Sequence, residues 1–169
     1  PRVRDVDTDQ LERDVNDFAD GKVEVEGLRL ATYEMVERVK ELEASKTYRM
    51  DVEFDAPVAA DDLQAALAEL TGATIHQATP QRVAHRRADL TRTREVYDAS
   101  GELLDDRHAD LRIHGAGGLY VKELVSSDEG RTEPSLAGLL GVGAEVTALD
   151  VLDVEGEDEP FDKAQFLLE

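Results

Sequence analysis

A run of strictly alternating residues from Tyr48 to Phe54 constrains the fold more than any other feature of the sequence. The apolar residues Tyr48, Met50, Val52 and Phe54 are separated by Arg, Asp and Glu. Side chains of a β-strand point to opposite faces in turn, so a period of two predicts a strand with one face buried. The chain must therefore contain a sheet that packs one face against a core.

Four segments have the apolar spacing or the start signals of helices. Asp7 or Thr8 caps the first and Gly21 stops it, Thr32 caps the second, and Gly72 closes the third. The fourth is short and follows a Pro-Ser pair. The predicted helices cover residues 8–19, a segment from Thr32 that ends at Ser45 and Lys46, residues 60–70, and a segment that continues from Pro134-Ser135 through Leu140.

Further apolar runs predict strands at irregular intervals between these helices. One of them has a kink at Gly27, and a turn at Ala99–Gly101 joins two others. Strands and helices mixed in this way favour an α+β fold, with a mixed, largely antiparallel sheet flanked by helices, over a doubly wound fold. A chain of 169 residues is expected to form one compact domain with one core. These strands are predicted over residues 23–30, 74–77, 91–98, 109–114, 119–122 and 145–154.

The charge balance limits the kinds of partner that the surface can attract. There are 39 acidic and 19 basic residues, a net charge of −20, and the bases comprise 14 Arg and five Lys. Such a surface repels polyanions. The composition fits a cytoplasmic protein of a salt-loaded cell, where high ionic strength screens self-repulsion, and an ordinary acidic protein is the alternative.

Several kinds of site and location are excluded or disfavoured by composition. The chain has no Cys, which excludes disulfides and thiolate metal sites, and its four His lack metal-ligand spacing. No apolar run of about 18 residues is present, so no membrane partner is expected. The start of the chain lacks a secretion leader, which favours the cytoplasm, and we expect no metal in this segment.

The stretch from Arg82 to Arg94 has the opposite charge to the rest of the chain. It holds five of the 14 Arg within 13 residues, and Asp89 is its only acid. Guanidinium groups pair well with phosphates, so this arginine-rich segment predicts contact with an RNA backbone. The alternative is that its arginines neutralise neighbouring carboxylates. Its basic residues are Arg82, His85, Arg86, Arg87, Arg92 and Arg94.

A glycine-rich turn precedes the run Leu119-Tyr-Val-Lys122. Gly115, Gly117 and Gly118 would allow a backbone or a nucleotide to approach closely, although a hairpin turn with positive φ explains them as well. Lys122 follows the alternation of its expected strand onto the face opposite Val121. A lysine there is usually solvated, and an enclosed one would need a carboxylate partner. Tyr48, on the apolar face of its strand, is likewise compatible with plain core packing.

Read together, several stretches resemble the archaeal Pus-ten family of tRNA pseudouridine synthases. The resemblance covers nearly the whole chain. It implies a pseudouridine synthase catalytic-domain fold, present in part, and a protein that binds the T-arm of tRNA. The stretches are Ser45-Lys-Thr-Tyr48, Thr79 to Tyr97, Gly117-Gly-Leu-Tyr-Val-Lys-Glu-Leu124, Gly130-Arg-Thr-Glu-Pro-Ser135 and Ala148-Leu-Asp-Val-Leu-Asp-Val154.

The resemblance also implies a reaction and roles for individual residues. The family isomerises the adjacent T-loop uridines at tRNA positions 54 and 55, without cofactor or metal. An Asp engages the flipped-out nucleotide, a Tyr assists proton transfer at C5, and a basic residue pairs with the Asp. By motif, Tyr48 is that tyrosine and Lys122 the basic partner, and Val121 and Leu149 line the base pocket. The arginine-rich segment then contacts the tRNA backbone beside this pocket.

Two parts of the family's pattern are expected to be absent from this chain, the N-terminal RNA-binding region and the segment that carries the nucleophile. In the family the nucleophile lies in a Gly-Arg-Glu-Asp-Val-Asp type segment, and Arg4-Asp-Val-Asp7 matches this only superficially, so neither Asp5 nor Asp7 is assigned. Residues 1–169 are therefore expected to be the C-terminal portion of a catalytic domain, ending in an acidic tail over 155–169. We expect the segment alone to be inactive, with the missing N-terminal half as its partner.

Two other functions remain open from the sequence alone. A non-catalytic RNA-binding module could use the same fold and the same arginine-rich segment. An acidic protein-interaction domain, whose arginines only satisfy internal carboxylates, is the third possibility. Only an enzyme would need Lys122 aimed into a pocket beside Tyr48.

Overall fold

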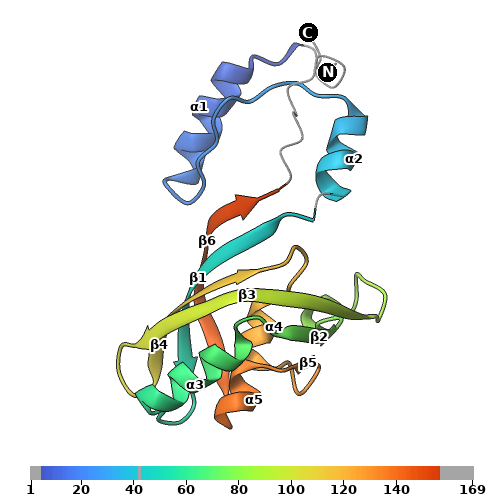
Figure 1. Ribbon diagram of the computed structural model, residues 1–169. Coiled ribbons are helices and arrows are strands. Elements are labelled where there is room, and N and C mark those ends of the chain that lie inside the picture. The colour runs from blue at the N-terminus through green and yellow to red at the C-terminus, as the bar shows by residue number, and fades with distance from the viewer. Residues whose placement is uncertain (1–4, 42, 157–169) are drawn as a thin grey trace. The chain divides into compact units, whose positions relative to one another are not determined.

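A computed structural model of the chain describes residues 5–41 and 43–156 (Figure 1). The described residues fall into two compact units that meet in sequence at residue 42, instead of the one compact domain expected, and the hydrophobic core lies in the larger unit. The first 41 residues bury little apolar surface, with Met35 their one buried hydrophobic side chain among those described. Most of the acidic tail predicted over residues 155–169 lies outside the described residues.

The N-terminal unit contains two helices, α1 (Thr8–Ala19) and α2 (Tyr33–Glu41), as the sequence predicted. The Asp7 carboxylate caps α1 by accepting hydrogen bonds from the backbone N–H groups of Asp9 and Gln10. The Thr32 hydroxyl accepts one from the N–H of Met35 at 3.3 Å, which confirms the second cap. Both caps satisfy backbone donors that the helix itself leaves free.

The strand predicted over residues 23–30 is wrong, because this stretch is irregular. The side-chain amide of Asn16 donates to the Val25 carbonyl and accepts from the Val25 N–H, both at 2.8 Å. Glu12 accepts from the N–H of Leu28 at 3.2 Å. Side chains of α1 thus take the place of a neighbouring strand as hydrogen-bond partners for this backbone.

The larger unit, residues 43–156, is built on an antiparallel sheet of six strands (Figure 1). Their order across the sheet is β5-β2-β3-β4-β1-β6, and every pairing among the described residues is antiparallel. The α+β class predicted from the sequence is therefore correct. The strands are β1 (Ser45–Phe54), β2 (Thr74–Ala78), β3 (Thr91–Leu103), β4 (His108–Gly115), β5 (Thr132–Glu133) and β6 (Ala144–Glu155).

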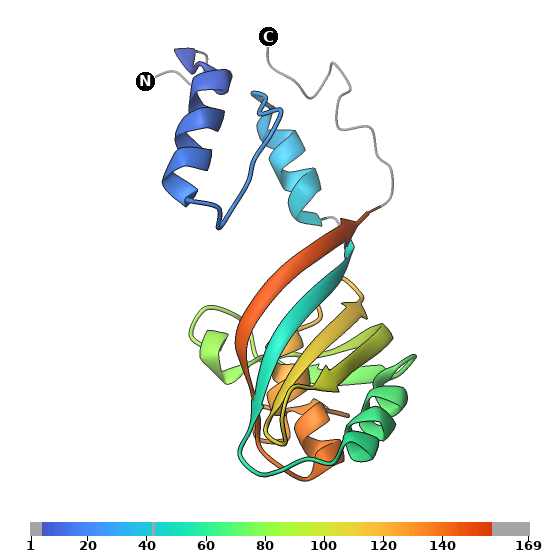
Figure 2. The same ribbon diagram turned by 90° about the vertical axis from the view of Figure 1, so that its left-hand side faces the viewer.

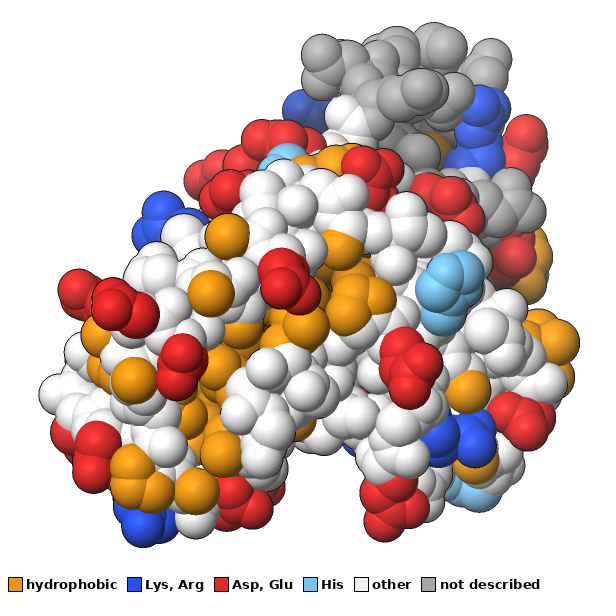
Figure 3. Space-filling view, turned by 60° about the horizontal axis from the view of Figure 1, so that its bottom comes forward, with side chains coloured by type: hydrophobic (Ala, Val, Ile, Leu, Met, Phe, Trp, Pro, Cys, Tyr) orange, Lys and Arg blue, Asp and Glu red, His pale blue; other side chains and the backbone are white. Residues whose placement is uncertain are grey.

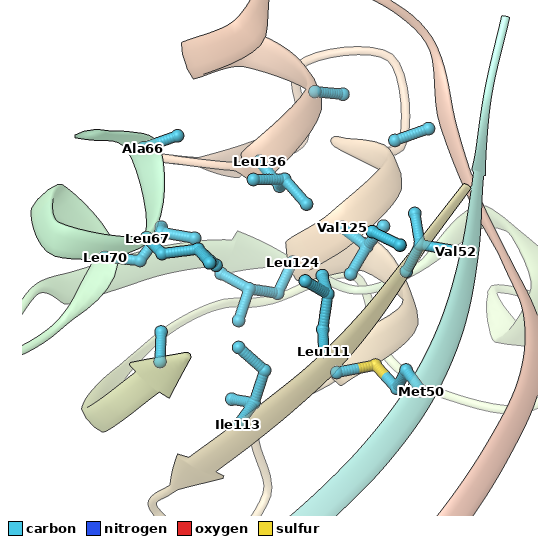
Figure 4. Close-up of a cluster of buried hydrophobic side chains, with 14 of the residues drawn as sticks. Met50, Val52, Ala66, Leu67, Leu70, Leu111, Ile113, Leu124, Val125 and Leu136 are labelled. Atoms are coloured by element: carbon cyan, nitrogen blue, oxygen red, sulfur yellow. The ribbon is translucent and has the colours of Figure 1, made fainter. Parts of the chain in front are cut away.

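Three helices cover one face of this sheet and form the core with it. They are α3 (Ala60–Leu70), α4 (Val121–Ser126) and α5 (Leu136–Leu140). Figure 2 shows α3 and α5 beside each other at one end of the strands. Ser135 begins α5 by accepting a hydrogen bond from the N–H of Gly138. Figure 4 shows side chains of β1 and β4 meeting those of α3, α4 and α5.

The alternating run in β1 behaves as the sequence predicted. Met50, Val52 and Phe54 are 0–2% exposed and belong to the core, and Tyr48 is half-buried on the same face. On the opposite face the Arg49 guanidinium pairs with Asp110 at 2.7 Å. One face of β1 therefore supplies the core and the other carries ion pairs.

The turn predicted at Ala99–Gly101 is wrong, because β3 continues through it to Leu103. Ala99 is buried, and Gly101 pairs with Leu111 of β4 so closely that a Cβ atom would meet the Asp110 carbonyl. The glycine permits a close approach of two strands here and does not mark a turn. The chain reverses after Leu103 instead.

The strand predicted over residues 119–122 is also wrong, because α4 begins at Val121. Val121, Leu124 and Val125 follow the i, i+3, i+4 spacing of a helix and are all buried. Leu119 is buried as well, so Leu119 and Val121 alternate with Tyr120 and Lys122 as residues of a strand would. This alternation is too short to distinguish a strand from the start of a helix. Lys122 consequently lies on a helix.

Acidic side chains are more widespread than basic ones over the end of the larger unit that carries α3 and α5 (Figure 3). Hydrophobic side chains lie in a hollow between them. None of the described helices is both long enough and apolar enough to cross a bilayer. The described residues also include no group of three or more His, Asp or Glu side chains placed to hold a metal ion.

Candidate active site

Tyr48 lies on β1, on the face of the sheet that the helices cover. It is half-buried, packs against the core and pairs in register with Ile113 of β4 and Val151 of β6. Burial raises the pKa of its phenol, because the phenolate would lose hydration. Within the described part of the chain the hydroxyl makes no hydrogen bond. Tyr48 is therefore a neutral phenol at neutral pH, with a free donor and acceptor.

Lys122 is the second residue of α4 and is exposed, whereas Val121 beside it is buried. It borders a pocket of about 440 Å³ whose wall also includes Arg82, Glu145 and Val146. No carboxylate among the described residues lies within 4.0 Å of its ammonium group. Being exposed, Lys122 does not need a partner for its own stability and is free to pair with an acidic group.

Leu149 lies between Tyr48 and the pocket of Lys122. It pairs in register with Met50, whereas Val146 in the wall of the pocket pairs with Val52. Tyr48 is four residues from Val52, roughly 13 Å along a strand. Tyr48 and Leu149 are thus on the face of the sheet that α4 covers, but the pocket beside Lys122 does not include either of them. Val121 is part of the core.

The arginine-rich segment is a structured connection between β2 and β3. It begins with a short 3₁₀ helix, Gln81–Val83, labelled η2. Thr79 is fully buried at its base, where its hydroxyl donates to the Ala88 carbonyl at 2.7 Å. The same hydroxyl accepts from the N–H of Leu90 at 3.1 Å, which closes the loop. Arg131 donates to the Thr79 carbonyl at 2.7 Å from outside the loop.

The basic residues of this segment occupy three different environments. His85, Arg86 and Arg87 are exposed, and no carboxylate among the described residues pairs with them. Arg82 instead forms an ion pair with Glu123 at 2.5 Å. The interpretation of the arginines as partners of internal carboxylates therefore applies to Arg82, and the exposed residues remain available to an external anion.

Arg92 and Arg94 are half-buried and lie on the same side of β3 as Val96. The Arg94 Nε atom is buried without a hydrogen bond, and its closest carboxylate contact is with Glu43 at 4.0 Å. Gly118 lies against this guanidinium with φ +81°, so a Cβ atom there would stand about 3.0 Å from Nε. The glycine-rich turn therefore accommodates Arg94, and Gly117 accommodates the backbone of residues 43 and 44.

Sequence reasoning missed two buried polar residues that organise this region, Gln77 and Glu123. They are 1% and 5% exposed. Gln77 follows Ile75 two residues later on the inner face of β2, so the alternation of this strand could have predicted that Gln77 is buried. Glu123 gave no such signal, because its stretch was interpreted as the end of a strand.

This arrangement of sheet, helices and basic loop has a counterpart among solved structures. A chain in the crystal structure of a Cbf5-Nop10-Gar1 complex superposes on 73% of this chain and 36% of its own length, with a TM-score of 0.56 and 27% identity. The fold is therefore an α+β domain of the pseudouridine synthase catalytic type, as the sequence motifs predicted.

The family itself follows from the sequence comparisons. The chain belongs to the family described as "Pus10, C-terminal", whose model matches residues 1–155. It is 69% identical over its full length to the tRNA pseudouridine synthase Pus10 of Halorubrum lacusprofundi and 43% identical over 162 residues to that of Pyrococcus furiosus. It spans only 40–41% of the length of these two relatives.

Proposed function

We propose that this chain is the C-terminal portion of the catalytic domain of a tRNA pseudouridine synthase that isomerises the T-loop uridines at positions 54 and 55. The nucleophilic Asp would come from outside this segment, in the N-terminal part of the complete enzyme. The observation that carries the proposal is the 69% identity, over the whole chain, to a protein named tRNA pseudouridine synthase Pus10.

The reaction requires two groups from this segment, one that transfers a proton and a cation that pairs with the Asp. The isomerisation breaks the bond from N1 to the sugar and joins C5 to the sugar, so C5 loses a proton and N1 ends with one. Tyr48 is a neutral phenol with a free hydroxyl and suits the proton transfer at C5. Lys122 has a free ammonium group, which suits pairing with the Asp. Leu149, and Val121 at the edge of the core, would line the base pocket.

Binding of the tRNA would rely on the arginine-rich segment. Arg86, Arg87 and His85 present cationic or polar groups to solvent on a loop that Thr79 holds closed. Arg92 and Arg94 lie further along β3, where Arg94 has an unused donor. Each arginine can bind a phosphate through two N–H groups. The acidic remainder of the surface would repel the RNA elsewhere and so favour one orientation.

The test uses a chimera in which this chain replaces the matching segment of the Halorubrum lacusprofundi synthase. Release of tritium from a T-loop RNA labelled at uridine C5 reports the reaction, at a potassium chloride concentration that keeps the protein folded. We expect release from the chimera and a loss of about 100-fold or more for Lys122→Ala, the range for removal of one preorganised donor that stabilises the transition state. Lys22→Ala, the same substitution at an exposed lysine of the other unit, is the matched control.

The outcomes separate the synthase from the non-catalytic RNA-binding module. Release that depends on Lys122 but not on Lys22 supports the synthase. A folded chimera that binds the RNA without any release refutes the enzyme and favours a non-catalytic RNA-binding module. Loss of RNA binding by Arg86→Gln, with a shallower dependence on salt, would assign the backbone contacts to the arginine-rich segment in either case.

A further inference from the structure

The turn that carries Lys122 is held by two side chains from the β2–β3 region. Gln77 of β2 is 1% exposed, and its amide binds both backbone groups of Tyr120. Its Nε2 donates to the Tyr120 carbonyl at 2.9 Å, and its Oε1 accepts from the Tyr120 N–H at 3.0 Å. Because Tyr120 is the N-cap residue of α4, these bonds fix the point where the helix starts.

Arg82 holds the other side of the same turn. Its Nε and Nη2 atoms donate to Glu123 Oε1 and Oε2 at 2.5 and 3.3 Å, a bidentate pair. The guanidinium carbon lies 5.9 Å from the centroid of the Tyr120 ring, within the range of a cation–π contact. The side chain of Glu123 is only 6% exposed, so its carboxylate depends on this pairing.

The helix itself offers little to fix its first turn. It has six residues, and no side chain caps its N-terminus. A helix this short is unstable without tertiary contacts, so its position is set by what it packs against and what it bonds to. Val121 and Leu124 anchor the helix in the core, and the buried Glu123, next to the exposed Lys122, is held by Arg82.

We propose that Arg82 and Gln77 are positioning residues that fix the first turn of α4 and thereby aim Lys122, a role that rests on the proposed synthase activity. Arg82, although 51% exposed, is then distinct from the other exposed arginines of its own segment. Its guanidinium is engaged by Glu123, whereas Arg86 and Arg87 are open to solvent. A displacement of Lys122 by about 1 Å would cost rate and leave the affinity for tRNA unchanged.

The kinetic test compares Arg82→Gln, Glu123→Gln and the double substitution in the chimera. Each single variant is expected to lower kcat about tenfold with KM for the T-loop RNA within about twofold, and the double variant to lose no more than either one, since both break the same contact. Arg82→Lys keeps the charge but loses the bidentate geometry, so kcat should recover in part. Arg86→Gln is the matched control and should raise KM with kcat retained.

Contrary results have definite meanings. A raised KM with unchanged kcat for Arg82→Gln would make Arg82 a phosphate ligand and overturn the proposal. Losses that add up in the double variant would also overturn it, because the two side chains would then act separately. Measurements are made at temperatures where circular dichroism shows every variant folded, and Arg82→Lys serves if Arg82→Gln does not fold.

A readout without catalysis separates this proposal from the proposed function. Hydrogen exchange of the amides of residues 120–126 is measured by mass spectrometry on the full chain. Exchange should be faster in Arg82→Gln and Glu123→Gln than in Arg86→Gln, whether or not the chimera is active. Unchanged exchange would overturn the positioning role. Faster exchange together with an inactive chimera would support the role of Arg82 in fixing the first turn of α4 and would reject the synthase activity.

Discussion

Single residues close the turn between β3 and β4, and their charges make it sensitive to pH. The His108 Nδ1 atom lies 2.8 Å from Asp105 Oδ1, which also accepts from the N–H of Arg107. The hydrogen bond to Asp105 raises the pKa of His108, and nearby Glu53 acts in the same direction. The hydrogen bond from the backbone N–H of Arg107, followed by the hydrogen bond with the His108 side chain, lowers the pKa of Asp105.

The pair therefore stabilises the turn within a window of pH. His108 contributes stability to the fold below its usual pKa of 6.5, and this stability is lost as the pH rises through the pKa of His108 in the folded protein. Asp105 contributes stability above its usual pKa of 3.8, and this stability is lost as the pH falls through the pKa of Asp105 in the folded protein. NMR titration should give His108 a pKa above 6.5. In the Asp105→Asn variant the pKa of His108 should fall back toward 6.5. A normal value in the unsubstituted chain would disprove the pairing in solution.

At the scale of elements, α4 joins the core to the candidate site. Leu124 is fully buried and faces the inner side chains of β1 and β4 (Figure 4). Its neighbour Glu123 is held by Arg82 of the arginine-rich segment. The same turn of α4 therefore contacts both the core and the arginine-rich segment. The packing of Leu124 and the ion pair of the buried Glu123 together determine the position of Lys122.

We predict that Leu124→Ala lowers the free energy of unfolding by about 2–5 kcal/mol, because it removes buried methyl groups and leaves a cavity. Urea unfolding followed by circular dichroism measures the change. Leu104→Ala, at a leucine that is 63% exposed, should cost much less. Equal losses at the two positions would mean that α4 is not packed against the sheet in solution.

The whole molecule carries a net charge of −20, which makes its stability depend on salt. The screening length falls from about 10 Å at 0.1 M to about 3 Å at 1 M salt, so repulsion between surface carboxylates weakens. We predict that the urea midpoint rises with potassium chloride over this range. The experiment tests the interpretation of the acidic, lysine-poor composition as an adaptation to a salt-loaded cell.

A variant with fewer charges is the control for the salt prediction. Glu69, Asp98 and Glu102 are exposed and form no ion pairs among the described residues, so Glu69→Gln, Asp98→Asn and Glu102→Gln remove repulsion without breaking contacts. The triple variant should be more stable at low salt and respond less to added salt. If the urea midpoint of the triple variant rose with salt as steeply as that of the unsubstituted chain, salt would stabilise the protein other than through charge.

The sequence alone determined the features that are encoded within a few residues. The alternation that ends at Phe54 produced β1, the Asp7 and Thr32 caps started α1 and α2, and the motifs around Tyr48 and Lys122 led to the correct family. Amphipathic period and capping are local properties, since each depends on side chains only one or two turns away. The cluster of arginines was visible for the same reason.

Only the tertiary structure decided which of two local possibilities each ambiguous segment took. Val121 became the start of a helix, and Gly101 stayed within a strand, because core neighbours far away in the sequence favoured those conformations. The partner of Arg82 was likewise set by Glu123, 41 residues away. Such choices rest on burial and pairing between distant segments, whose energies leave no periodic pattern in either segment alone.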